Sequence, residues 1–143
     1  MDHVVYLDAK AGELSKLLLG DKKMIIRGAA GRKMPYGRVN EKDKLYLIEN
    51  DGSGFVRAST IVKSVTNSEK MSKDESIALV EENQNQLQLT SKQFKRCAGK
   101  RYLVLIEVED VAELEPFCID KSEYGNMDDW LPVGDIEKVK IIG

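Results

Sequence analysis

The sequence predicts an α+β protein built on a mainly antiparallel sheet, curved or closed into a β-barrel, with two to three short helices. Helical segments separate strands that are not direct neighbours along the chain, as in α+β folds. A turn of Asn, Asp, Gly and Ser at residues 50–54 joins two apolar segments, as in a β-hairpin. The 143 residues suffice for one core, and neither a linker nor a repeat divides them, so we expect one domain over residues 1–143.

The first third of the chain is predicted to alternate strands with one helix and a loop. A strand at 3–7 precedes a helix that begins after Asp8, a suitable N-cap, and ends at Leu19, where Gly20 stops it. The segment 28–37 contains three glycines and one proline and is expected to be a loop. Further strands are expected on either side of this loop and of the hairpin turn, at residues 24–27, 44–49 and 55–65.

The second half is predicted to hold two helices and the strongest strand. Ser72 and Glu75 have the spacing of a capping box, which indicates a helix to about Asn83. The polar stretch 83–88 is expected to be a loop or a frayed helix end, and Thr90 or Ser91 to begin a short helix that ends at Gly99. The apolar run 102–108 is typical of a central strand. Two further extended segments are expected, at 114–119, interrupted by Pro116, and at 136–142.

Basic residues are concentrated between Gly20 and Lys44, where eight Lys or Arg face three acids and the net charge is about +5. The whole chain carries −2, so about −7 belongs to the remainder. This asymmetry favours an anionic ligand that binds the first third of the chain. No apolar run is long enough to span a membrane, and no export signal is recognisable, so a cytoplasmic protein is expected. Cys97 and Cys118 are then free thiols.

The order of elements and one short motif resemble the ASCH domain of the PUA-like superfamily, a small β-barrel thought to bind RNA. The family signature Gly-x-Lys-x-x-Glu-x-Arg stands here as Gly20-x-Lys22-x-x-Ile25-x-Arg27, with Ile25 in place of the glutamate. Segments 40–47, 55–65 and 101–108 resemble later strands of the family, and the likeness extends from Leu7 to about Val111. The resemblance implies a PUA-like barrel with a basic cleft.

The candidate binding residues come from this basic window and from one later aromatic residue. Arginine can hold a phosphate through two parallel hydrogen bonds, lysine adds a point charge, and an aromatic ring can stack on an unpaired base. Glycine-rich backbone also lets N–H groups approach phosphate oxygens. Phosphate contacts are therefore predicted from Lys22, Arg27, Arg32, Lys33 and Arg38, and stacking from Tyr36 or Trp130.

Each candidate also has a structural interpretation. Arg27 can pair with an acid from the C-terminal third, the loop at 28–38 can be a solvated loop with incidental charge, and Trp130 can plug the end of the barrel. Tyr124 and Asn126 precede Trp130 and are candidates for a base pocket with it. A second basic cluster is interpreted as the solvent-exposed face of a helix, and consists of Lys92, Lys95, Arg96, Lys100 and Arg101. His3 is expected to be a strand residue without chemistry.

The predicted function is an RNA- or nucleotide-binding module that uses the basic cleft. The alternative is a small hydrolase, of the amidohydrolase or ribonuclease type, acting on a modified nucleoside or RNA. Resemblance to the amidohydrolases of the group would make Lys22 a catalytic lysine, but Ile25 occupies the position of their hydroxyl nucleophile, so the catalytic set is incomplete. A protein partner with an acidic surface is a third interpretation. One histidine and no clustered cysteines indicate neither a metal site nor a cofactor.

Overall fold

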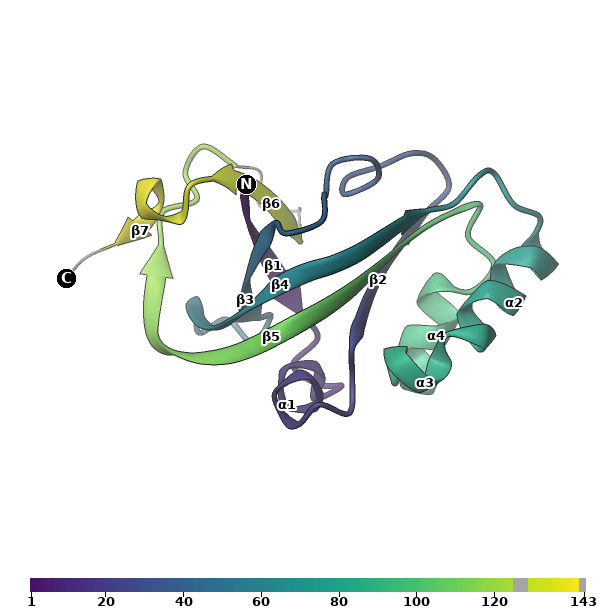
Figure 1. The fold of residues 1–143 in the computed structure, drawn as a ribbon, viewed down its shortest axis with the longest axis horizontal. Helices are drawn as coiled ribbons and strands as arrows, with labels where there is room; N and C mark the ends of the chain where they lie inside the picture. The colour runs from purple at the N-terminus through teal and green to yellow at the C-terminus, as the bar shows by residue number, and fades with distance from the viewer. Residues whose placement is uncertain (125–128, 142–143) are drawn as a thin grey trace.

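The computed structural model describes residues 1–124 and 129–141 and contains one seven-stranded sheet (Figure 1). Its strand order is β2-β5-β4-β3-β1-β6, and β7 pairs with β5 beyond this path. β1 and β3 run parallel, whereas the other neighbours are antiparallel, so the predicted α+β class with a mainly antiparallel curved sheet is confirmed. The strands are β1 (Asp2–Leu7), β2 (Met24–Ala29), β3 (Lys44–Glu49), β4 (Phe55–Asn67), β5 (Tyr102–Ile119), β6 (Trp130–Gly134) and β7 (Lys140–Ile141).

Four short α-helices lie in the described part of the chain: α1 (Glu13–Leu19), α2 (Lys73–Glu82), α3 (Gln84–Leu87) and α4 (Ser91–Cys97). The capping box predicted at Ser72 is present at the start of α2, and Thr90 forms a second one with Gln93 at α4. Figure 1 shows α2, α3 and α4 gathered at one end of the sheet, whereas α1 lies alone below β1. No helix in the ranges 1–124 and 129–141 is long and apolar enough to cross a membrane.

α1 begins four residues later than predicted. Asp8 caps a turn instead of the helix, because its Oδ1 accepts a hydrogen bond from the backbone N–H of Ala11. Gly12, with φ 66°, then enters the helix in the left-handed conformation, which glycine adopts at little cost. The turn Asp8–Gly12 consequently stands free of the helix and forms one wall of the site described below.

β5 is one strand of eighteen residues where two separate segments were predicted. It pairs with β4, and three register shifts interrupt the pairing. Pro116 falls within one of these shifts, between the partners Glu113 and Phe117, where a missing N–H does not disrupt the ladder. Such bulges bend a strand without ending it, and β4 and β5 curve together across the molecule (Figure 1).

The C-terminal segment also differs from the strand predicted at 136–142. Asp135 accepts a hydrogen bond from the N–H of Glu137 and caps a 3₁₀ turn, Ile136–Lys138, and only Lys140 and Ile141 pair as a strand. Ile136 and Val139 are both buried, and their spacing of three matches a 3₁₀ turn. Residues 142–143 lie outside the described ranges.

β2 is buried on both faces, and this fixes where the basic window emerges. Ile25 points into the main core with Leu14, Leu17 and Trp130, whereas Met24 and Ile26 pack against the helical layer. That layer contributes Val80, Leu87 and Leu89 from α2, α3 and the segment before α4. The C-terminal end of β2, at Arg27 and Gly28, therefore emerges between the Asp8–Gly12 turn and α4.

Candidate functional site

A cavity of about 330 Å³ opens where the end of β2, the Asp8–Gly12 turn and α4 meet. This volume lies within the range of small-molecule sites. Its walls mix apolar groups, Ile26 and Leu89, with charged and polar side chains from all three segments. The charged and amide groups in its lining are Asp8, Glu13, Arg27, Asn50, Gln93, Arg96, Lys121 and Asp129.

A smaller hollow of about 120 Å³ lies on the other side of Arg27. Its lining includes Lys33 and Tyr36 from the loop at 28–38 and Tyr102 from the start of β5. Arg27, Gly28 and Asp129 line both hollows. The two spaces are therefore adjacent, with the Arg27 side chain at the boundary. We call them the large and the small hollow.

The Arg27 guanidinium is held mainly by backbone carbonyl oxygens. Its terminal nitrogens donate to Tyr6 O at 2.7 Å and to Ile26 O at 2.9 Å, and it lies 5.6 Å from the centroid of the Trp130 ring. Nε lies 3.1 Å from Oδ2 of Asp129, the acid from the C-terminal third expected in the structural interpretation. Arg27 is 18% exposed and Asp129 is 60% exposed, and such a solvated ion pair contributes little stability. An anion that binds Arg27 can thus displace Asp129 at small cost.

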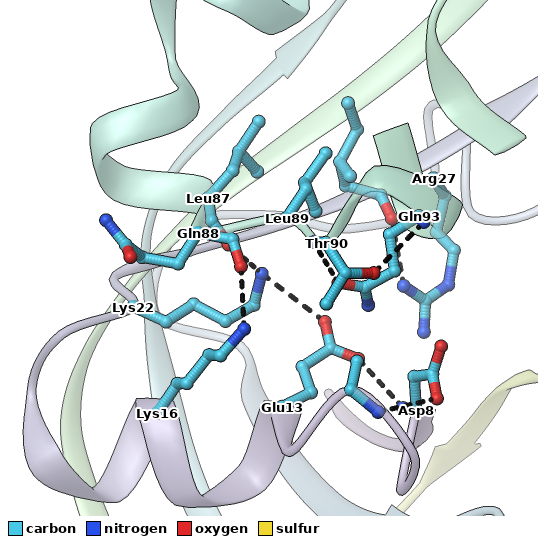
Figure 2. Close-up of polar contacts among 12 residues, drawn as sticks. Asp8, Glu13, Lys16, Lys22, Arg27, Leu87, Gln88, Leu89, Thr90 and Gln93 are labelled. Carbon is cyan, nitrogen blue, oxygen red and sulfur yellow. Dashed lines mark hydrogen bonds and ion pairs between the residues drawn. The ribbon is translucent and has the colours of Figure 1, made fainter. Parts of the chain in front are cut away.

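Lys22 lines neither hollow and is buried behind Glu13, which lines the large one, with 1% of the Lys22 side chain exposed. Nζ donates a hydrogen bond to the carbonyl oxygen of Leu87 and lies 3.4 Å from Oε2 of Glu13 (Figure 2). Burial lowers the pKa of Lys22, and the Glu13 carboxylate opposes this shift. In this structure Lys22 joins α1 to the end of α3, rather than standing at the mouth of the barrel as predicted.

The same polar network fixes two walls of the large hollow. Glu13 accepts a hydrogen bond through Oε1 from the N–H of Asp8 at 2.9 Å, which holds the turn against α1. Lys16 donates to the carbonyl oxygen of Gln88 at 3.0 Å, which holds the segment before α4. Figure 2 shows these side chains converging from α1 and from residues 87–93 toward one another. Because the contacts are buried or partly buried, the cavity walls are preorganised.

Of the four candidate residues in the loop at 28–38, two line the small hollow and two do not. Lys33 lines the small hollow, and Tyr36 lines it too, with its hydroxyl donating to Ser68 O and its ring packing edge-on against Tyr102 at 5.6 Å. Arg32 lies outside the lining, with its guanidinium carbon 5.7 Å from the ring centroids of both tyrosines. Arg38 is exposed and lines neither hollow. The structure therefore brings Arg27, Lys33 and Tyr36 together, with Arg32 beside them.

Trp130 is buried in the main core, with 1% of its surface exposed. Its indole N–H donates to Nδ1 of His3 at 3.1 Å, and His3 Nε2 lies 2.9 Å from Asp43 Oδ2. The indole ring packs against the Arg27 guanidinium, and Trp130 lines neither hollow, so it offers no stacking surface there. Tyr124 packs against a separate buried cluster that includes Leu131 and Val133 of β6, and Asn126 lies outside the described residues.

Sequence reasoning missed several residues that line the two hollows. Arg96 belongs to the cluster interpreted as an exposed helix face, yet it lines the large hollow and its NH1 lies 3.6 Å from Asp8 Oδ2. Lys121 also lines it, with Nζ 3.3 Å from the Tyr6 hydroxyl. Tyr102 was predicted only as the first residue of a strand, yet it lines the small hollow. The one signal for Arg96 was its place in a second basic cluster.

No protein-family model and no curated protein matches the sequence. The solved structure of the ASCH protein of Zymomonas mobilis is similar at 11% identity, covering 96% of this chain and 90% of that chain with a TM-score of 0.70. A tyrosine-to-phenylalanine variant of that protein matches at 11% identity, 96% and 93% coverage and a TM-score of 0.70. A serine-to-alanine variant matches at 12% identity, 82% and 73% coverage and a TM-score of 0.62.

Proposed function

We propose that this chain, which has the ASCH fold of the PUA-like superfamily, binds RNA or a nucleotide-like anion in the cleft formed by the two hollows. The observation that carries the proposal is the placement of Arg27. Two carbonyl oxygens hold its guanidinium at the boundary of the hollows, and its only carboxylate partner in the described chain is the exposed Asp129. A guanidinium held in this way offers a fixed fork to a phosphate group.

The large hollow suits a nucleoside. Ile26 and Leu89 provide apolar surface for a base, while Arg96 and Lys121 add positive charge to the lining. The amide oxygens of Asn50 and Gln93 already accept hydrogen bonds from Ala9 N and Thr90 N. Their NH₂ groups are the donors left for acceptors on a base edge.

Charge limits the proposal to a focused site. The whole chain carries −2, and Asp8 and Asp129 stand beside the cations of the cleft. A general nucleic-acid coat would need a broad basic surface, and the acidic balance outside residues 20–44 opposes this. Binding is therefore expected to be local and to weaken steeply with salt, because each phosphate contact releases counterions.

The test is fluorescence anisotropy with a short single-stranded RNA at about 50 and 200 mM salt. Arg27→Lys keeps the charge but loses the fork and is expected to weaken binding about tenfold. Lys138→Ala removes an exposed lysine outside both hollows and is the matched control, expected to bind like the unaltered protein. Absence of binding at the lower salt concentration would reject the proposal.

The hydrolase alternative lacks its nucleophile at the expected position. Ile25 is fully buried in the main core and lines neither hollow. Lys22, the other residue that the resemblance implied, is enclosed between Glu13 and Leu87. RNA recovered from the binding assay and examined for shortened products tests this alternative directly, and intact RNA is the expected result.

A further inference from the structure

We infer that the cleft takes a single-stranded oligonucleotide spanning both hollows, so that a dinucleotide is a better ligand than a mononucleotide. The inference rests on the proposed function and goes beyond it by naming the length of ligand that the site accommodates. Its basis is that one residue, Arg27, borders two unequal spaces, each with a further cation in its lining: Arg96 in the large hollow and Lys33 in the small one.

The difference in volume assigns a part of the ligand to each hollow. The large hollow, at about 330 Å³, falls within the range of sites that enclose small molecules, whereas the small one, at about 120 Å³, falls below it. The small hollow is therefore unsuited to a second nucleoside. Lys33 and the Arg27 guanidinium line it, and two cations around a small space suit the next phosphate of the same strand.

Gly28 lies at the boundary between the two hollows and lines both of them. A side chain at this position would meet its surroundings at once: a Cβ would lie 2.9 Å from Leu103 Cδ2 and 3.2 Å from Lys100 Cγ. The absence of a side chain lets the Leu103 and Lys100 side chains pack directly against β2 at the boundary of the two hollows.

Beyond the small hollow, the loop offers a surface for the following base. The Arg32 guanidinium lies beside the paired rings of Tyr36 and Tyr102, 5.7 Å from each ring centroid, and the residue is exposed. The tyrosine rings hold the guanidinium by cation–π attraction. Bases that are not paired stack on guanidinium planes as they do on aromatic rings, so Arg32 is placed to receive one.

The experiment measures competition against a fluorescent single-stranded RNA. The competitors are uridine 5′-monophosphate and the dinucleotide pUpU, which shares its 5′-phosphate and adds one phosphodiester and one nucleoside. We expect pUpU to compete about tenfold or more better than the monophosphate. Lys33→Ala is expected to remove most of this advantage. It should also lower the salt slope for the fluorescent RNA by about 0.7, the value for one phosphate contact on a single strand.

The outcomes separate this inference from the proposed function. Equal competition by the two compounds, or an advantage of pUpU that survives Lys33→Ala, would overturn the inference and leave nucleotide binding in place. Failure of the fluorescent RNA to bind at low salt would instead reject the proposed function itself. Lys138→Ala, which removes a lysine outside both hollows, is expected to preserve the advantage of pUpU.

Discussion

Nζ of Lys22 lies 3.4 Å from Oε2 of Glu13, and both side chains are buried. An ion pair in such a position is tolerated only while both partners and their further hydrogen bonds are present. Here Lys22 also donates to Leu87 O, and Glu13 accepts from Asp8 N. The pair connects α1, α3 and the wall of the large hollow, so its loss is expected to affect stability and site geometry together.

Lys22→Met is expected to lower the free energy of unfolding by about 3–5 kcal/mol, because it leaves the Glu13 carboxylate buried without a cation. The double variant Glu13→Gln/Lys22→Met removes both charges and keeps an oxygen for Asp8 N, so it is expected to lose less than Lys22→Met alone. Urea unfolding followed by the fluorescence of Trp130, which is buried and the only tryptophan, measures both. A double variant less stable than Lys22→Met would contradict this account.

The buried contact between Trp130 and His3 predicts the tautomer of the imidazole. An indole N–H only donates, so Nδ1 of His3 must accept, and the ring proton sits on Nε2 and is donated to Asp43. Nitrogen chemical shifts measured by NMR at neutral pH should therefore show a protonated Nε2 and an unprotonated Nδ1. Trp130→Phe removes the donor and is expected to cost about 1–3 kcal/mol of stability for the unpaired Nδ1 alone. A ring protonated on Nδ1 would refute the assignment.

Gly28→Ala tests the close packing at the boundary between the hollows. The added methyl would meet Leu103, which is fully buried and cannot move aside easily, and the more adaptable stem of Lys100. Overpacking of this kind is expected to cost about 1–3 kcal/mol of stability. Gly31→Ala is the matched control, because a Cβ there meets no atom within 4 Å. Equal unfolding free energies for the two variants would show that the surroundings of Gly28 are less tightly packed than described.

Cys97 provides a pH-dependent reporter of the large hollow, which it lines. Burial raises the pKa of its thiol above the ordinary value of 9.0, so the reactive thiolate forms only at higher pH. Alkylation by iodoacetamide is expected to be slow at about pH 8 and to accelerate only above pH 9, as followed by mass spectrometry. An inflection of the rate below pH 9 would contradict the shift.

The same reaction reports on occupancy of the cleft. RNA bound in the large hollow is expected to protect Cys97 from alkylation. Cys118 is the internal control, because it lies on β5 beside Phe55 and Ile141 and lines neither hollow. RNA that binds but protects neither cysteine, or both equally, would place its site elsewhere.

Features that depend on neighbouring residues were predictable from the sequence. The capping box at Ser72 and Glu75 is present because its hydrogen bonds span only three residues. Runs of apolar residues predicted the two strands of the hairpin and the first part of β5. These strands in turn indicated the fold class. The concentration of basic residues pointed to the segment that contributes Arg27, Lys33 and Tyr36 to the cleft. These features depend on the spacing and composition of short stretches, and both can be taken directly from the sequence.

Tertiary structure alone decided how those residues are used. Lys22 is buried and Lys33 lines a hollow, although both are lysines of one basic window, because only Lys22 meets a buried carboxylate and a carbonyl oxygen from α3. Trp130 lies in the core beneath Arg27, and Arg96 and Tyr102 reach the cleft from distant segments. Burial and pairing depend on contacts between residues far apart in the chain, and the free energy of a charged group changes with its partner and its exposure to water. Local sequence patterns do not contain that information.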